Sequence, residues 1–183
     1  MIHMAGGREY SPGKLTELVL YIANRAVNDP TFGRVKLNKI LWYSDFEAFR
    51  VRGESITGAR YQNLAEGPAL LAMVPLMREL TEKGDIREVA GGAGPKHLRP
   101  MALRVEDLGE FSAAEIAIVS DFIAQFWAKP ASEVSLVSHD TKAWRLTERQ
   151  QEIPYGMVVL SEEEPTEADL AWLSEVAGAG LGA

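Results

Sequence analysis

The stretch that decides the fold is GRVKLNKILWYSDFEAFRVRGESITGARYQNLAEGPALL, residues 33–71. Its first part predicts a helix from Arg34 to Arg52 that ends at Gly53, because glycine readily takes the left-handed conformation that closes a helix. One mainly apolar stripe repeats with helical spacing and comprises Leu37, Ile40, Leu41, Ser44, Ala48 and Val51. A second stripe lies on roughly the opposite side and comprises Val35, Trp42, Phe46 and Phe49. A helix with two apolar faces is predicted to be central and buried.

Between the two stripes lies an edge of charged and aromatic residues, namely Lys36, Lys39, Tyr43, Glu47 and Arg50. We expect this edge to reach solvent or a partner. In the second case Lys36 and Lys39 would meet an acidic or mixed surface, and Tyr43 would supply an aromatic anchor. The candidate partner-binding residues are therefore Lys36, Lys39, Tyr43 and Arg50. The alternative is an ordinary exposed face that Glu47 partly neutralises.

The residues on either side of this helix predict two more helices. Ser11 and Pro12 suit an N-cap and a first helical position, so a helix should begin there. Residues 54–66 have weak periodicity and predict a loop or an extended segment. We expect a turn over residues 69–74 and a regular helix beginning near Pro75, because proline inside a helix removes a backbone hydrogen bond.

The second half of the chain predicts a hairpin followed by helices. Apolar runs at 86–89 and 98–103 flank a glycine-rich loop, which indicates a β-hairpin. Ser112 and Glu115 form a capping box, which opens a helix that continues to Trp127. A shorter helix should follow Pro130 and end near residues 138–140, with Trp144 on a further short turn. Residues 157–160 suggest a strand, and a last helix should begin at Thr166. We expect the tryptophans Trp42, Trp127 and Trp144 to lie in the core.

Length and composition indicate a single compact cytoplasmic domain. The 183 residues suit one domain, no apolar run approaches the roughly 20 residues of a membrane span, and no signal peptide is recognisable. The net charge of −7 lies entirely in the tail, since residues from Glu148 onward hold 8 acidic side chains and 1 basic one. The remaining 18 of each sign leave the body neutral, which makes a nucleic-acid partner less expected.

Catalytic and metal sites are not expected from the residues. Ser138, His139 and Asp140 are parts of a nucleophilic triad, but three consecutive side chains diverge and cannot form the required hydrogen-bonded chain. We expect His139 to be structural and to bond a backbone carbonyl near Gly67 and Pro68. The three histidines are far apart and cysteine is absent, so neither a metal site nor a cofactor is predicted.

Several separated motifs together resemble the Panacea domain, the family that includes SocA-like antitoxins. These are KLNKILWY at residues 36–43, ARY at 59–61, EGP at 66–68, the pair Ser138-His139, and Trp144. The similarity spans about residues 15–154, and it departs from the family pattern at Glu66 and at Ser44-Asp45. The motif residues interpreted as structural are Leu37, Trp42, Gly67, Pro68, Ser138, His139 and Trp144. Gly67 should have a positive φ.

The resemblance implies a function that the residues alone do not provide. Panacea-domain proteins resemble the antitoxin halves of toxin–antitoxin pairs of bacteria, phages and mobile elements. The expected partner is a cognate toxin protein, neutralised by direct binding or by delivery to a Clp-type protease as a proteolytic adaptor would do. The alternative is a winged-helix DNA-binding regulator that uses basic residues near the hairpin, namely Arg87, Lys96, Arg99 and Arg104.

The predicted architecture is α+β and mainly helical, a compact single domain around a central buried helix with a small β-hairpin. We expect a flexible N-terminal arm over residues 1–10 and a Panacea-like domain over 11–160. An acidic C-terminal helix with a flexible end should occupy residues 161–183.

Overall fold

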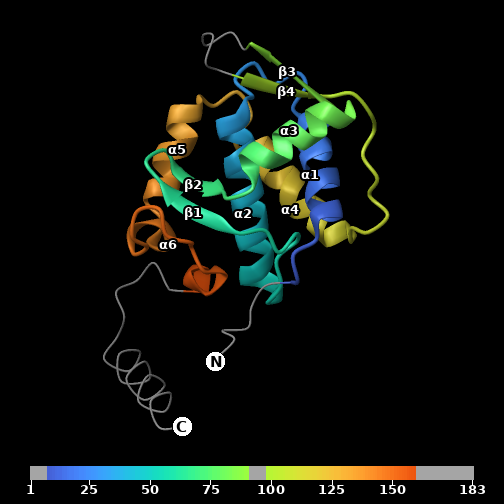
Figure 1. Ribbon diagram of the computed structural model, residues 1–183. Helices are drawn as coiled ribbons and strands as arrows, with labels where there is room; N and C mark the ends of the chain where they lie inside the picture. Colours follow the sequence, from blue (N-terminus) through green and yellow to red (C-terminus); the bar gives the residue numbers. More distant parts are fainter. Residues whose placement is uncertain (1–7, 91–97, 160–183) are drawn as a thin grey trace, which may run out of the picture.

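Helix α2 (Arg34–Arg52) runs through the middle of the computed structural model, which describes residues 8–90 and 98–159 (Figure 1). Its neighbours include α1 (Pro12–Arg25), α4 (Ala113–Gln125) and α5 (Ala131–His139). The strands β2 (Gly67–Leu70) and β4 (Leu98–Ala102) and the 3-10 helix η1 (Tyr155–Val159) also contact it. Because neighbours surround α2, residues of both predicted stripes are buried, and the prediction of a central helix is confirmed. Val35 and Phe49 are half-buried, and Val51, in the last turn, is exposed.

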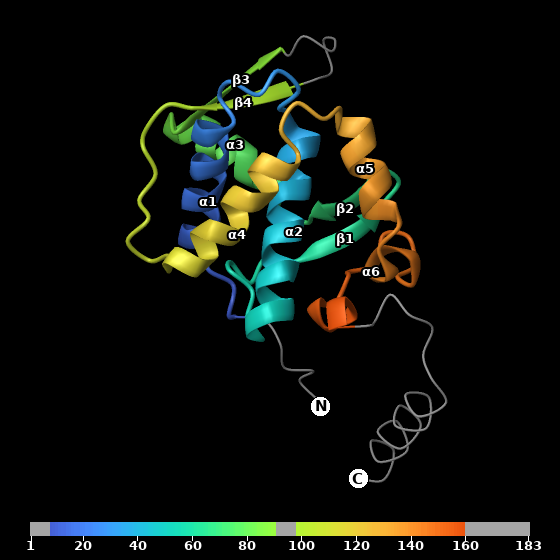
Figure 2. The same ribbon diagram turned by 180° about the vertical axis from the view of Figure 1, so that it is seen from behind.

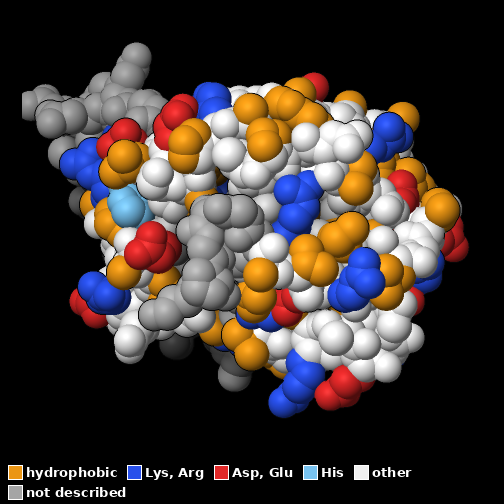
Figure 3. All heavy atoms as spheres, turned by 90° about the horizontal axis from the view of Figure 1, so that it is seen from above, with side chains coloured by type: hydrophobic (Ala, Val, Ile, Leu, Met, Phe, Trp, Pro, Cys, Tyr) orange, Lys and Arg blue, Asp and Glu red, His pale blue; other side chains and the backbone are white. Residues whose placement is uncertain are grey.

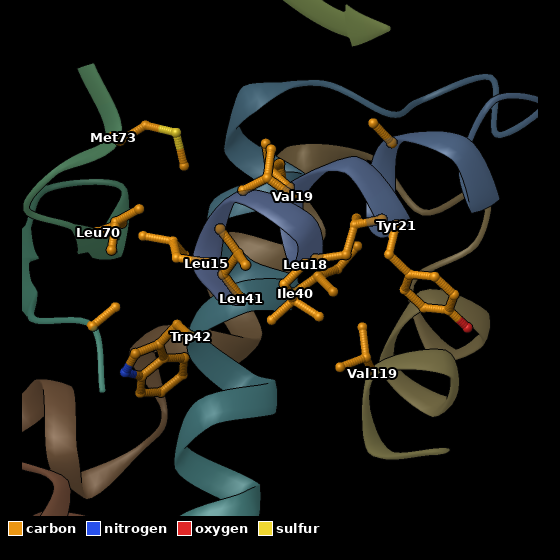
Figure 4. Close-up of a cluster of buried hydrophobic side chains, with 14 of the residues drawn as sticks. Leu15, Leu18, Val19, Tyr21, Ile40, Leu41, Trp42, Leu70, Met73 and Val119 are labelled. Carbon is orange, nitrogen blue, oxygen red and sulfur yellow. The ribbon is translucent and has the colours of Figure 1, made fainter. Parts of the chain in front are cut away.

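The core forms where α1 crosses α2, and Figure 4 shows side chains from both helices meeting there. Leu15, Leu18 and Val19 of α1 pack with Ile40 and Leu41 of α2, and all of them are buried. Helix α4 lies against the same two helices (Figure 2). The capping box predicted for Ser112 and Glu115 is present. Both ends of α2 follow the prediction too, since it begins after Gly33 and ends at Gly53, which has a φ of +74°.

Two antiparallel hairpins complete the fold, and only one of them was predicted. Strands β3 (Ile86–Ala90) and β4 form the predicted hairpin, whose loop at 91–97 lies outside the described residues. The other hairpin pairs β1 (Tyr61–Leu64) with β2; we expected a loop or an extended segment at β1 and a turn over 69–74, but no pairing between them. These four-residue strands have too few positions to show alternation. Contacts from distant residues stabilise β1, because the Ile153 amide donates to the Tyr61 carbonyl at 2.8 Å.

Two other predictions need correction. Helix α3 (Met73–Lys83) begins before Pro75, which therefore lies in its first turn. Proline is tolerated there, because the backbone amides of the first turn have no hydrogen-bond partner within the helix. The strand expected over 157–160 is instead the 3-10 helix η1, which packs against α2, and Leu160 lies outside the described residues. The short turn expected at Trp144 is confirmed as α6 (Lys142–Arg145).

The fold class is therefore α+β and mainly helical, as predicted. The predicted acidic helix at 161–183 lies outside the described residues, as does most of the predicted arm at 1–10. Their roles as separate segments stay predictions. In the part of the chain that the structure describes, no helix is both long and apolar enough to cross a membrane.

Candidate functional site

The motif residues that are far apart in the sequence meet at the turn between β1 and β2. Gly67 opens β2 with a φ of +93°, so the predicted positive φ is confirmed. A Cβ atom at this position would lie 2.3 Å from the Ser138 hydroxyl oxygen and 2.6 Å from the Lys39 amine nitrogen. It would also lie 3.3 Å from Cδ2 of His139. Only glycine fits here, because both the backbone conformation and the surrounding atoms exclude a side chain.

Lys39 lies under this turn. We had expected its side chain to reach solvent, but it does not. It is 2% exposed, and its Nζ donates a hydrogen bond to the Pro68 carbonyl at 2.9 Å. Burial lowers the pKa of Lys39 to about 7, although the nearby Glu66 carboxylate acts in the opposite direction. A hollow of about 380 Å³ adjoins it, lined by Val35, Asn38, Leu64, Ala65, Glu66, Gly67, Pro68, Ala69 and Arg149 as well as Lys39.

Ser138, His139 and Trp144 hold the hairpin against α5 and α6. The buried Ser138 hydroxyl donates to the Ser135 carbonyl at 2.6 Å, so its proton is directed at the backbone of α5 and not at a catalytic base. The His139 ring stacks on Trp144 with 4.2 Å between ring centres, and the Trp144 indole donates to the Leu64 carbonyl at 3.2 Å. The bond expected from His139 to the Gly67-Pro68 turn is not observed, because Lys39 donates to the Pro68 carbonyl instead.

Lys36 is also buried, in a different polar cluster about one turn earlier along α2. It is 1% exposed, and its Nζ lies 2.7 Å from Asp29 Oδ2 and 3.0 Å from the Phe126 carbonyl. Thr31 also contacts this amine through its hydroxyl oxygen. Burial alone would raise the pKa of Asp29, but hydrogen bonds from Lys36 and Thr31 hold it below its ordinary value. The expectation that Lys36 and Lys39 reach solvent is therefore wrong, because α2 has packed neighbours on that edge too.

Tyr43 and Arg50 remain at or near the surface of the predicted edge. Tyr43 is half-buried and stacks on Phe122, and its hydroxyl oxygen has no hydrogen-bond partner in residues 8–90 and 98–159. Burial raises the pKa of Tyr43. Arg50 is exposed and makes two hydrogen bonds to Glu47, at 2.7 and 2.6 Å. Partner binding by Tyr43 and Arg50 stays a prediction.

The remaining motif residues, Leu37 and Trp42, lie in the core, and Trp42 appears with its neighbours in Figure 4. Trp144 is half-buried, whereas Trp127 is exposed, so the expectation that all three tryptophans lie in the core fails at Trp127.

Asp45 is an important residue whose role we did not predict. Its carboxylate is fully buried and accepts hydrogen bonds from the Ile56 and Thr57 amides at 2.9 and 2.8 Å. The Thr57 and Tyr61 hydroxyls donate to it at 2.6 and 2.7 Å. Burial raises the pKa of Asp45, and these donors oppose the rise. A carboxylate four residues after the buried Leu41 was the available signal, because that spacing places it on a buried face.

The basic residues near the second hairpin are mostly used within the fold. Arg99 donates to the Asp29 and Ala26 carbonyls at 2.8 and 3.2 Å, and Arg104 binds Glu17 and Asp85, each at 2.7 Å. Arg87 is exposed, and Lys96 lies outside the described residues. Figure 3 views the molecule from above Figure 1 and shows Lys and Arg side chains scattered among hydrophobic and acidic ones on that face. DNA binding stays a prediction that salt-dependent binding would test.

A metal centre has no basis in the described residues. Over 8–90 and 98–159 there is no group of three or more histidine, aspartate or glutamate side chains that could hold a metal ion. The polar groups at the Gly67 turn come from a lysine, a serine and a backbone carbonyl that bond to the protein itself. These hydrogen bonds connect the hairpin to α2 and fix the Ser138 hydroxyl within α5.

The comparison with known families agrees with the resemblance that these motifs indicate. The family model described as antitoxin SocA-like, Panacea domain, matches residues 37–145, which is more than half of the chain. The chain belongs to this antitoxin family. The match contains most of α2, both hairpins, and the Ser138, His139 and Trp144 cluster. No curated protein and no solved structure matches the chain.

Proposed function

We propose that this protein is the antitoxin of a toxin–antitoxin pair and neutralises a cognate toxin by binding it directly. The observation that carries the proposal is the antitoxin family match over residues 37–145. A function based on binding also agrees with the polar clusters at Lys36, Lys39 and Asp45. Their hydrogen bonds join segments of the fold to one another, so these groups serve its rigidity.

A rigid framework suits direct binding, because a surface that is already ordered loses little conformational entropy when a partner docks. The Gly67 turn, held by three separate segments, is one such element. The family match accounts for the kind of partner, and the fold accounts for a fixed shape that a toxin would recognise. Neutralisation then requires only that the complex be more stable than the toxin's contact with its target.

The test is co-expression with the product of the neighbouring open reading frame. We expect that product to arrest growth when expressed alone, to be harmless with this protein, and to co-elute with it in size-exclusion chromatography. A harmless neighbour that fails to co-elute would contradict the proposal.

The same co-expression in a strain without Clp proteases separates two ways of neutralisation. Continued rescue would establish capture by binding alone. Loss of rescue with an intact complex, accompanied by an increased amount of toxin, would establish delivery of the toxin to the protease.

A further inference from the structure

Trp127 lies at the surface although the aromatic residue that precedes it is buried. Its exposed fraction is 41%, whereas the preceding Phe126 is 1% exposed. The following residue, Ala128, has a φ of +57°, in the left-handed region that a residue with a Cβ seldom occupies. Such a conformation costs about 1–2 kcal/mol, so the surrounding structure must hold it in place.

The buried cluster around Lys36 supplies that support. The Ala128 amide donates to Asp29 Oδ1 at 3.2 Å, and the Lys36 amine donates to the Phe126 carbonyl at 3.0 Å. The Thr31 hydroxyl donates to the Lys129 carbonyl at 2.8 Å. Backbone groups on both sides of Trp127 are therefore fixed from inside the protein. The cluster keeps the segment in its strained conformation with the indole ring directed away from the core.

Trp127 borders a shallow groove between α1 and α4, two helices that lie side by side in Figure 2. The groove has a volume of about 300 Å³ and is lined by Tyr21, Arg25, Ser120, Ile123, Ala124 and Trp127. The Arg25 guanidinium lies 5.2 Å from the centre of the Tyr21 ring. Tyr21 is fixed in turn, since its hydroxyl is 2.8 Å from the Ser120 hydroxyl. Tyr21 is buried, whereas Trp127 and Arg25 are exposed, and tryptophan and arginine are among the residues that most often dominate binding energy at protein interfaces.

The charge of the groove indicates the chemistry of its occupant. Arg25 is exposed, and no carboxylate in residues 8–90 and 98–159 lies within 4.0 Å of its guanidinium. Of the other exposed arginines, Arg50 and Arg60 pair with glutamates, whereas Arg78 and Arg87 resemble Arg25 in having no carboxylate of the described residues within 4.0 Å. Arg25 differs from them in lying beside the exposed Trp127 at the groove. An incoming carboxylate could therefore bind Arg25 without displacing an existing ion pair, and an apolar side chain beside it would cover the exposed Trp127 and Ala124.

We propose that the groove between α1 and α4 is a docking surface for a protein segment that presents an apolar side chain next to an acidic one. This inference rests on the proposed function and identifies the segment as part of the toxin. The buried Lys36 and Asp29 and the half-buried Thr31 are positioning residues for Trp127.

The experiment measures the affinity of the full chain for the neighbouring gene product by calorimetry. Trp127→Ala and Arg25→Glu should each weaken binding about tenfold or more, because they remove a hot-spot ring and reverse a charge. Leu136→Ala on α5 and Arg78→Glu on α3 alter exposed residues away from the groove and should change the affinity less than about twofold. Unchanged circular dichroism and thermal unfolding would show that Trp127→Ala and Arg25→Glu are folded.

The outcomes distinguish this inference from the proposed function. If the wild-type protein binds the toxin and both groove variants bind equally well, the docking surface is wrong and the antitoxin function stands. If the wild-type protein does not bind the toxin, both are wrong. If Trp127→Ala converts a dimer of the free protein to a monomer while toxin affinity stays constant, a second copy covers the groove and the proposal is overturned.

Discussion

Lys36 and Lys39 lie about one turn apart on α2, and both are buried, but their amines have different partners. Lys36 meets the Asp29 carboxylate, the Thr31 hydroxyl and the Phe126 carbonyl. Lys39 meets one carbonyl, that of Pro68, and no carboxylate of the described residues lies within 4.0 Å of it. A buried charge is stable only where nearby groups compensate for the water it has lost. The first lysine is a paired ion, whereas the pKa of the second falls to about 7.

This difference shows that two similar motif positions can have separate physical roles. The cluster at Lys36 joins α1, α2 and the segment after α4, so its charges contribute to the position of distant backbone. The turn at Lys39 brings the hairpin, α2 and α5 together around a glycine, and close packing is the main requirement there. Variants of the Lys36 cluster should therefore lower stability by leaving a charge unpaired, whereas variants of the Gly67 turn should lower it by disturbing close packing.

The largest expected effect is that of Lys36→Met, which leaves the buried Asp29 carboxylate without its cation. Removing one partner of a buried ion pair typically costs about 3–5 kcal/mol of unfolding free energy. Urea denaturation followed by circular dichroism measures this loss. The double variant Lys36→Met/Asp29→Asn should recover part of it, because no unpaired charge remains. A single variant as stable as the wild type would show that the pair contributes little.

The next effect is that of Gly67→Ala, which acts on the packing around Lys39. The new methyl group would overlap the Ser138 hydroxyl and the Lys39 amine, in addition to the strain of a positive φ. We expect a loss of about 2–4 kcal/mol in the same measurement. Gly53→Ala is the matched control, since Gly53 has a φ of +74° but no atom within 4 Å of the added group. Its loss should be about 1 kcal/mol, and equal losses at both positions would refute the packing argument.

The smallest effect concerns the pH dependence that Lys39 adds to stability. At acidic pH the Lys39 amine is charged in both the folded and the unfolded protein, so burying the charge lowers the unfolding free energy by its full cost. Above about pH 7 the folded protein releases the proton, whereas the unfolded chain keeps it up to about the ordinary value of 10.5. The unfolded state then binds more protons, so stability should rise with pH, by about 1–2 kcal/mol between about pH 7 and 9.

Lys39→Met should lack this rise and should be about as stable as the wild type near neutral pH. Lys83→Met, which alters an exposed lysine on α3, is the control and should keep the rise. Unfolding free energies of the three proteins across this pH range provide the measurement. A wild-type profile that coincides with that of Lys39→Met would mean that Lys39 stays charged in the folded protein.

The sequence by itself determined the local features of this protein. The start and end of α2, its two apolar faces, the capping box at Ser112 and the β3–β4 hairpin all follow from residue order. The positive φ at Gly67 was also predictable from its local motif, and the family from several short motifs that occur in order along the chain. These features depend on neighbours within a few positions, where periodicity and capping preferences act.

Only the tertiary structure decided which polar residues are buried. Lys36 and Lys39 occupy an edge that is polar by helical periodicity, yet Asp29 from the loop after α1 and Pro68 from β2 approach that edge in space. Asp45 is buried because residues 56–61 fold back over it, and Trp127 is exposed because a strained turn at Ala128 directs it outward. Local spacing cannot encode these outcomes, since a side chain's burial depends on segments far away in the chain that pack against it.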